Sequence, residues 1–332
     1  SGATFTQDAD FSGATFTHAA YFGNATFTHA AYFGNATFTQ VAFFRDVRFT
    51  QATRFNRATF TQNAYFSGAT FTQNAYFSGA TFTQDVYFSG ATFEGAAKFI
   101  DAKFGFREGS KICVPDFTEA AFAKVVSFRE AHFATHYPVL EGTQFREALV
   151  VTAKPAHWPD QQQQLLDVVD PKKGYAPTKE VAKESCASLR HELAKQGMPE
   201  EEHFFFRREM HFASQIDGWW QRLPYRLFGV FSNYGESIAK PTRALGELYV
   251  IGAGAFFGHF LATKGLLSAV TLSLSLSFSK LLPLFGFGRT FLKDALFGLP
   301  PYLQVISAAQ TVLALPLLFF LGLGLRKRFR LR

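Results

Sequence analysis

The sequence predicts a β-solenoid, followed by an α-helical hairpin and a two-span transmembrane α-helical region. Three observations predict this order. A repeat of eleven residues runs from Ala3 to Phe104, the spacing of apolar residues becomes helical after Thr178, and two long apolar runs with basic flanks lie after residue 244. A short fixed period is typical of a solenoid, because each unit buries its apolar face only by stacking on the next.

The repeat is divided by phenylalanine into steps of five and six residues, as in ATFTQDADFSG and ATFTHAAYFGN. Every phenylalanine of the series from Phe5 to Phe104 is present. Alanine stands two residues before nearly all of them, with Val47, Thr53 and Val86 as exceptions. A small residue beside each large ring fits a narrow interior, where a second large side chain would not pack. These positions form the predicted core.

Units such as ATFTQ and ATFTH resemble those of the pentapeptide-repeat family, in which a small residue and a large central apolar residue point inward. The sequence departs from the common form by having Phe rather than Leu at the centre and one extra residue in alternate units. The resemblance implies a right-handed quadrilateral β-helix over residues 1–150, with adjacent coils ~4.8 Å apart. It also implies two opposite interior stacks of rings, Phe5, Phe27, Phe49, Phe71 and Phe93 in one and Phe16, Phe38, Phe60 and Phe82 in the other.

Two columns of outward side chains are the candidate interaction surface. Tyr21, Phe43, Tyr65 and Tyr87 share one face, and Asp10, Tyr32, Arg54, Tyr76 and Lys98 share the opposite face. An outward aromatic ladder can serve as a recognition surface. Alternatively, the stacked rings only stabilise the outer wall, and the alternation of Tyr with Arg and Lys permits cation–π contacts between coils.

The register breaks after Phe104, at GFREGSKICVPD, and resumes from Phe117 to Phe145. We expect loops at 105–116 and near 135–142 to finish and cap the open end of the solenoid. Residues 151–177 contain four prolines and a glutamine run and are predicted to be a linker.

Residues 178–216 are predicted to form a helical hairpin. Apolar residues from Val181 to Leu193 share one helical face, and a second helix begins after Pro199 with three glutamates in its first turn. His203 and His211 are eight residues apart, which is not the spacing that places two ligands on one helical face. No metal site is therefore predicted here.

Two apolar runs, residues 245–263 and 302–325, are close to the ~20 residues that cross a bilayer. They belong to a predicted membrane domain, residues 244–332. Their basic flanks belong on the cytoplasmic side, which also places the repeat and both termini there. Residues 217–243 predict an interfacial amphipathic segment. The predicted membrane-interface anchors are Trp219, Trp220, Arg222, Arg226, Lys240, Arg243, Arg326, Lys327, Arg328 and Arg330.

The intervening residues 265–300 are predicted to be re-entrant or interfacial, because a third span would move the basic tail to the other side. A helix, a dipping segment and a second helix are also the layout of cation-channel pore modules. Gly286-Phe287-Gly288 resembles part of a potassium-channel filter, but Pro, Leu and Phe precede it where Thr and Val are expected. Lys280 and Arg289 add positive charge, which disfavours cations.

The basic excess lies in the second half of the chain. Residues 1–150 carry 11 Lys and Arg against 12 Asp and Glu, whereas the rest carries 22 against 14. This distribution favours an anionic bilayer as the partner, rather than nucleic acid. Cys113 and Cys186 have no CxxC spacing, which predicts neither a disulfide framework nor a zinc site. The sequence has no motif for a catalytic nucleophile or a nucleotide, so we predict no enzyme activity and no cofactor.

The region 178–332, with its LPYRLFGVFSNYGES stretch and LGLGLRKRFRLR end, resembles that of bacterial membrane-anchored pentapeptide-repeat proteins. The resemblance implies the bacterial inner membrane and a non-enzymatic scaffold that presents a rigid cytoplasmic β-helix to an unknown protein partner. The alternative is a channel-like pore subunit regulated by the β-helix. Gly252, Gly254 and Gly258 in the first span permit close helix approach and a homo-oligomer. Because the chain opens within a repeat, we expect further repeats before Ser1.

Overall fold

The computed structural model describes residues 2–105, 113–159, 179–216 and 218–329. It divides into two compact units, Ser1–Asp217 and Gly218–Arg332, which are described separately. Most of the predicted loop at 105–116 and of the predicted linker at 151–177 lies outside the described residues.

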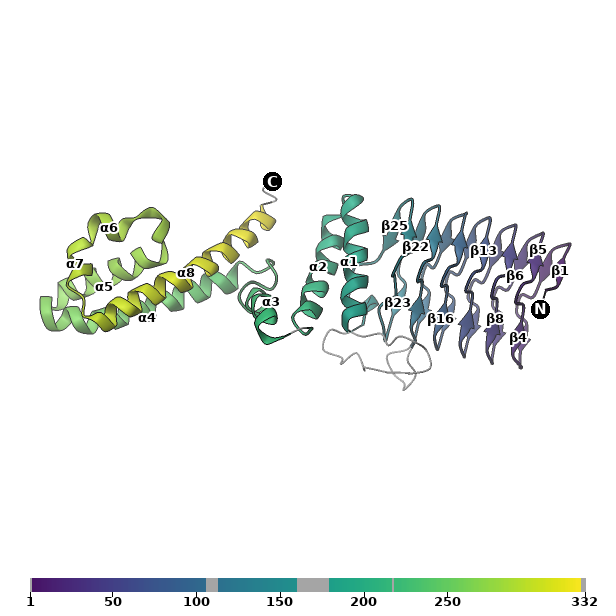
Figure 1. Cartoon of the computed structure of the whole chain (residues 1–332), viewed down its shortest axis with the longest axis horizontal. Coiled ribbons are helices and arrows are strands. Elements are labelled where there is room, and N and C mark those ends of the chain that lie inside the picture. Colours follow the sequence, from purple (N-terminus) through teal and green to yellow (C-terminus); the bar gives the residue numbers. More distant parts are fainter. Residues whose placement is uncertain (1, 106–112, 160–178, 217, 330–332) are drawn as a thin grey trace. The chain divides into compact units, whose positions relative to one another are not determined.

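The first unit contains a β-solenoid of about six turns, which confirms the predicted fold class. Its walls are four parallel sheets, and the chain visits them in turn before starting the next coil (Figure 1). The first sheet contains β1 (Thr4–Phe5), β5 (Thr26–Phe27), β9 (Arg48–Phe49), β13 (Thr70–Phe71), β17 (Thr92–Phe93), β21 (Ala121–Phe122) and β24 (Gln144–Phe145). The second contains β2 (Ala9–Asp10), β6 (Ala31–Tyr32), β10 (Thr53–Arg54), β14 (Ala75–Tyr76), β18 (Ala97–Lys98), β22 (Val126–Phe128) and β25 (Leu149–Val151).

The other two sheets face these across the interior. The third contains β3 (Thr15–Phe16), β7 (Thr37–Phe38), β11 (Thr59–Phe60), β15 (Thr81–Phe82), β19 (Lys103–Phe104) and β23 (His132–Phe133). The fourth contains β4 (Ala20–Tyr21), β8 (Ala42–Phe43), β12 (Ala64–Tyr65), β16 (Val86–Tyr87) and β20 (Pro115–Asp116). Thr4 pairs with Thr26 and Phe5 with Phe27, so two eleven-residue units make one coil.

Each coil turns its corners through a left-handed backbone position that recurs every eleven residues. Gly13, Asn24, Asn35, Asp46 and Arg57 occupy it with φ angles of 69°, 58°, 55°, 54° and 56°. Glycine and asparagine adopt this conformation at little cost, whereas most other residues do not. The corner sequences of the repeat therefore set where the chain bends.

Phenylalanine fills the interior in four stacks rather than two. The rings of Phe33, Phe55 and Phe77 stack at 4.8 and 4.9 Å, and Phe44 and Phe66 each meet Phe55 edge-on at 5.3 Å. All of these rings are fully buried. The two stacks named in the sequence analysis lie in the first and third sheets, where Phe5 stacks on Phe27 at 4.4 Å and Phe16 on Phe38 at 4.6 Å.

The helical hairpin is part of the first unit and covers the C-terminal end of the solenoid. It consists of α1 (Lys179–Lys195) and α2 (Pro199–Ala213) (Figure 1). The Ser185 hydroxyl donates to the Pro138 carbonyl at 2.6 Å, and Phe205 meets the buried Trp158 edge-on at 4.8 Å. The hairpin was predicted to be a separate segment; in the structure it packs onto the last coils, and its apolar face joins the core of the solenoid.

The second unit is helical. It contains α3 (Trp219–Ser232), α4 (Ala239–Lys264), α5 (Leu266–Leu281), α6 (Phe287–Phe291), α7 (Lys293–Phe297) and α8 (Pro301–Arg328), with a short 3-10 helix, η2 (Pro283–Phe285), before α6. Within the described residues, α4 and α8 are the two helices long and apolar enough to cross a membrane. They correspond to the two predicted spans. At 16 residues, α5 is shorter than the ~20 needed.

A polar junction joins α4, α5 and α8. The buried Gln310 amide donates to the Leu248 carbonyl and to the hydroxyl and carbonyl of Ser277. Ser277 in turn donates to the Tyr249 carbonyl at 2.8 Å. A side chain at Gly252 would lie 2.5 Å from the Gln310 amide, so glycine is what lets α8 approach α4 here.

Candidate functional site

The outer face of the fourth sheet carries a continuous aromatic column. Tyr21 stacks on Phe43 at 4.9 Å, Phe43 on Tyr65 at 5.2 Å, and Tyr65 on Tyr87 at 4.9 Å, with the ring planes within 8° of parallel. Tyr21 is 65% exposed, and the other three rings are half-buried because each covers its neighbour. The column therefore offers ring edges and hydroxyls to the solvent.

Two polar contacts fix the Tyr rings of this column. The Arg45 guanidinium lies 4.5 Å from the centroid of the Tyr65 ring. The Tyr87 hydroxyl donates to the Asp85 carboxylate at 3.1 Å. The aromatic column is thus held in place, and a partner would meet it without first ordering it.

The second sheet carries the other outward column, and its chemistry differs. Arg54 lies 5.7 Å from the ring centroids of both Tyr32 and Tyr76, and Lys98 lies 5.1 Å from that of Tyr76. The cationic groups lie over the faces of the Tyr rings, so neighbouring side chains of this column stabilise one another through cation–π contacts. Within each of the two predicted columns, the residues of successive coils lie in register.

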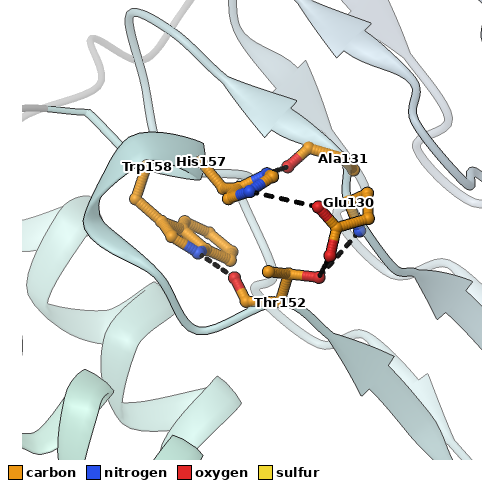
Figure 2. A network of polar contacts seen from close by, with 5 residues as sticks. All are labelled: Glu130, Ala131, Thr152, His157 and Trp158. Carbon is orange, nitrogen blue, oxygen red and sulfur yellow. Dashed lines mark hydrogen bonds and ion pairs between the residues drawn. The ribbon is translucent and has the colours of Figure 1, made fainter.

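A polar network at the end of the solenoid was not predicted from the sequence. Figure 2 shows it around Glu130, Thr152 and His157. The Glu130 carboxylate lies 3.4 Å from His157 Nε2 and 3.2 Å from the Thr152 hydroxyl, and the indole N–H of Trp158 donates to the Thr152 carbonyl at 2.8 Å. His157 Nδ1 lies 3.3 Å from the Ala131 carbonyl. The network fastens the Pro155–His157 turn to the last coils.

The Pro155–His157 turn, Trp158 and the helical hairpin together form a cap on the last coils. Arg208 of α2 lies within this cap. It is buried and donates to the Tyr137 hydroxyl and, at 2.8 Å, to the Pro159 carbonyl. Its guanidinium also lies 4.6 Å from the centroid of the Phe204 ring. A buried cation that is satisfied by a carbonyl, a hydroxyl and a ring face is a structural tie between hairpin and solenoid.

A buried group of titratable residues lies beside the cap. His136 is 3% exposed, and burial lowers its pKa to about 4. Burial, reinforced by the Asp85 carboxylate, raises the pKa of the Cys113 thiol well above its usual range. Burial also raises the pKa of the Cys186 thiol. Burial thus favours the neutral form of the imidazole and of both thiols, and a protonated thiol is a weak nucleophile.

The described part of the chain contains no group of three or more His, Cys, Asp and Glu side chains that could hold a metal ion. A cavity of about 340 Å³ lies between the last coils and α1, with Glu141, Glu184 and Ser188 among its lining residues. Its lining residues include no His or Cys.

Residues 1–37, 33–81 and 77–107 match the family model of pentapeptide repeats in nine copies. The first hundred residues are a pentapeptide-repeat array. No curated protein and no solved structure shows significant similarity to the chain. Pentapeptide-repeat solenoids are generally structural or interaction modules rather than enzymes.

Beyond the pentapeptide-repeat array, the helical unit exposes apolar side chains instead of burying them. Only 22% of the apolar window of α4, and the same share of α8, is buried. Val250, Ile251, Val305 and Phe319 are each more than 60% exposed. A core helix of a water-soluble protein would be mostly buried, so these faces are suited to a hydrocarbon environment.

The predicted interface anchors lie on α3, at the N-terminal end of α4 and at the C-terminal end of α8. Trp219 and Trp220 stack at 3.8 Å and are 63% and 69% exposed. Arg226, Lys240, Arg243, Arg326 and Arg328 are also exposed, and Arg222 is half-buried. Arg243 pairs with Glu247 at 2.9 Å. Arg330 and the side chain of Lys327 lie outside the described residues.

The structure describes both the glycines of the first predicted span and the Gly286–Gly288 segment that resembles a channel filter. Gly254 and Gly258 are exposed on α4, with open space where a side chain would lie. Gly286 is left-handed, with φ 67°, and Phe287–Phe291 is helical. A potassium-type filter needs a row of backbone carbonyls directed at the ion. The carbonyls of a helix point along its axis, so this segment does not have the backbone of such a filter.

Proposed function

We propose that the chain is a non-enzymatic, membrane-anchored scaffold that presents its pentapeptide-repeat solenoid to a protein partner on the cytoplasmic side. One observation carries the proposal. The interior of the solenoid is filled by phenylalanine from coil to coil, which leaves only the outer walls for recognition. Of these walls, the fourth sheet has aromatic rings whose edges and hydroxyls face the solvent without cations covering every ring.

The fourth sheet is preferred over the second for a physical reason. In the second sheet, Arg54 and Lys98 already occupy the faces of the Tyr rings. In the fourth sheet, the described contacts of the Tyr21 and Phe43 side chains are with other rings and not with cations. Rigid aromatic side chains contribute most to protein interfaces, because they bury a large area at a small entropic cost.

The membrane anchor of the proposal rests on α3, α4 and α8. In α3, Trp219, Leu223, Leu227 and Val230 are exposed on an amphipathic helix, and Phe228 on another face packs on Phe320 of α8 at 5.5 Å. An amphipathic helix of this kind lies in the plane of the membrane surface. The exposed apolar sides of α4 and α8 would then face lipid, with the basic ends of both at the cytoplasmic surface.

Site-directed photocrosslinking tests the scaffold. A photoreactive phenylalanine analogue at position 43 should crosslink a protein in native membranes, and Tyr65→Ala with Tyr87→Ala should reduce that crosslink at least tenfold. The matched control is Tyr32→Ala with Tyr76→Ala, which removes two rings from the second sheet and should leave the crosslink in place. An unchanged crosslink in the first double variant would exclude the fourth sheet as the contact surface.

Flotation and protease accessibility test the anchor. The chain should float with liposomes after carbonate extraction, and a protease added to the cytoplasmic side should degrade the solenoid, whereas a protease confined to the other side should not. Extraction into the soluble fraction would contradict anchoring. The alternative, a channel-like subunit, loses its main sequence support with the helical Phe287–Phe291 segment. Ion flux through liposomes that hold the purified chain would restore it.

A further inference from the structure

A cavity of about 830 Å³ lies among α5, α7 and α8 of the helical unit. Two ammonium groups, Lys280 and Lys293, line it together with the polar side chains of Gln304 and Ser307. The rest of the wall is apolar, with Leu299 and Val312 among its residues. Its volume is within the range of pockets that bind small molecules.

The cavity extends toward the basic ends of α4 and α8. Ser277 and Gln310 bond to the carbonyls of Tyr249 and Leu248, within about one turn of Leu245, where the predicted span 245–263 begins. Lys280 follows Ser277 by less than one turn of α5, and Thr311, which also lines the cavity, follows Gln310 in α8. Because α5 runs back along α4, Lys280 would lie near the headgroups of the leaflet at the basic ends of α4 and α8 if these helices cross a bilayer.

Charged side chains within a membrane domain are costly and mark ligand or ion sites. Lys293 makes no ion pair or hydrogen bond within the part of the chain that the structure describes. The lining residues of the cavity contain two lysines and no Asp or Glu. An anion would therefore complement this wall.

We propose that the cavity binds the headgroup of an acidic phospholipid, a step that rests on the membrane anchoring proposed above. The phosphate is placed to interact with Lys280 and Lys293. The Gln304 amide, which donates one hydrogen to the Leu299 carbonyl at 2.9 Å, keeps a second for the ligand. Phe297 and Val312, 78% and 66% exposed, form an apolar rim against which acyl chains can lie. The mixed wall favours an amphiphilic anion over a free phosphate ion.

Native mass spectrometry of the purified full chain in detergent tests this site. The probes are phosphatidylglycerol and phosphatidylcholine, and the expected result is a preferential, saturable retention of phosphatidylglycerol. Lys280→Gln with Lys293→Gln should weaken that retention by at least about tenfold, since each lysine near an acidic lipid contributes appreciably to binding. Lys195→Gln with Lys264→Gln, which removes two exposed lysines that are not among the predicted interface anchors, is the matched control and should change it less than twofold.

Several results would overturn the proposal. These are equal retention of the two lipids, an unchanged affinity in the Lys280 and Lys293 double variant, or an equal loss in the control. Displacement of phosphatidylglycerol by excess inorganic phosphate would assign the cavity to free phosphate instead. If the double variant elutes as an aggregate, Ala308→Trp provides a second test, because it narrows the cavity without removing charge and should also weaken retention.

The two proposals fail in different ways. Loss of the crosslink from position 43 concerns the solenoid surface and leaves the lipid measurement unaffected. A chain that does not float with liposomes removes the anchor but still permits the detergent measurement, which then reports on the cavity alone. Retained phosphatidylglycerol in a chain without a protein crosslink would support the lipid site and contradict the scaffold.

Discussion

The two units of the molecule use phenylalanine in opposite ways. In the solenoid, the interior phenylalanines from Phe27 to Phe104 are almost completely buried, whereas Phe291 and Phe297 of the helical unit are 77% and 78% exposed. The two units also differ in where their backbone amides find hydrogen-bond partners. In the solenoid, amides bond to the neighbouring coil, as Thr28 does to Phe5 at 3.0 Å, and in the helical unit they bond within each helix.

This difference indicates the solvent for which each unit is built. The solenoid hides its rings and presents threonine and charged side chains, as a unit in water must. The helical unit satisfies its backbone inside helices and buries the polar side chains between α4, α5 and α8, such as Ser277 and Gln310, which suits a hydrocarbon environment. The contrast supports an anchored scaffold because a single solvent would not accommodate both units.

Two matched Phe→Ala substitutions, one in each unit, test this difference in burial. Phe55→Ala removes a ring that touches Phe33, Phe77, Phe44 and Phe66, and it should lower the free energy of unfolding of the solenoid by about 3–5 kcal/mol. Phe319→Ala, on the exposed side of α8, should change the stability of the chain in detergent by less than about 1 kcal/mol. Urea titration followed by hydrogen exchange of peptides from each unit measures both. Equal losses would mean that Phe319 is packed in an interface.

The sequence predicted the solenoid well because its core is encoded locally. The phenylalanine series from Phe5 to Phe104 and the corner residues repeat with one period, so each coil specifies the next. The two long apolar helices were also predictable, since their length and composition are local properties. The register of the two outward columns followed from the same period.

The cap of the solenoid and the cavity lined by Lys280 and Lys293 could not be predicted from local sequence. Arg208 meets Tyr137 across 71 positions of sequence, and Gln310 meets Ser277 across 33. Neither pair belongs to a repeat, and a lone Arg or Gln in a helix gives no sign of its distant partner. The four proline residues after position 150 predicted a linker, but Trp158 among them is a buried part of the cap. Such contacts depend on the tertiary fold.

Acid should weaken the solenoid through His136. Neither of its ring nitrogens has a hydrogen-bond partner within the described residues, and burial lowers its pKa to about 4. The unfolded imidazole has a pKa near ~6.5, so between about pH 6.5 and 4 the unfolded state binds the extra proton. The free energy of unfolding is therefore highest above this window and falls by up to about 1.4 kcal/mol per pH unit as the pH is lowered through it.

The check for His136 is a comparison of two pH profiles. Urea unfolding of the chain between pH 7 and 5 should show a loss of about 2 kcal/mol that the His136→Leu variant lacks. The difference between the two profiles isolates His136 from the carboxylates, which titrate in both. Parallel profiles would show that the imidazole is as easily protonated in the folded solenoid as in the unfolded chain.

The smallest effect concerns the corner position. Arg57 is left-handed with φ 56° and exposed, so Arg57→Gly should stabilise the solenoid by about 0.5–1 kcal/mol, the difference between relieved backbone strain and the entropy cost of glycine. Gly79 occupies the same corner one coil later, and a side chain there would lie 3.2 Å from Arg57 Cγ. Gly79→Ala should therefore destabilise the solenoid by about 1–2 kcal/mol alone and by less in the Arg57→Gly background. Urea titration of the four chains measures this coupling, and strict additivity would show that the two corners do not touch.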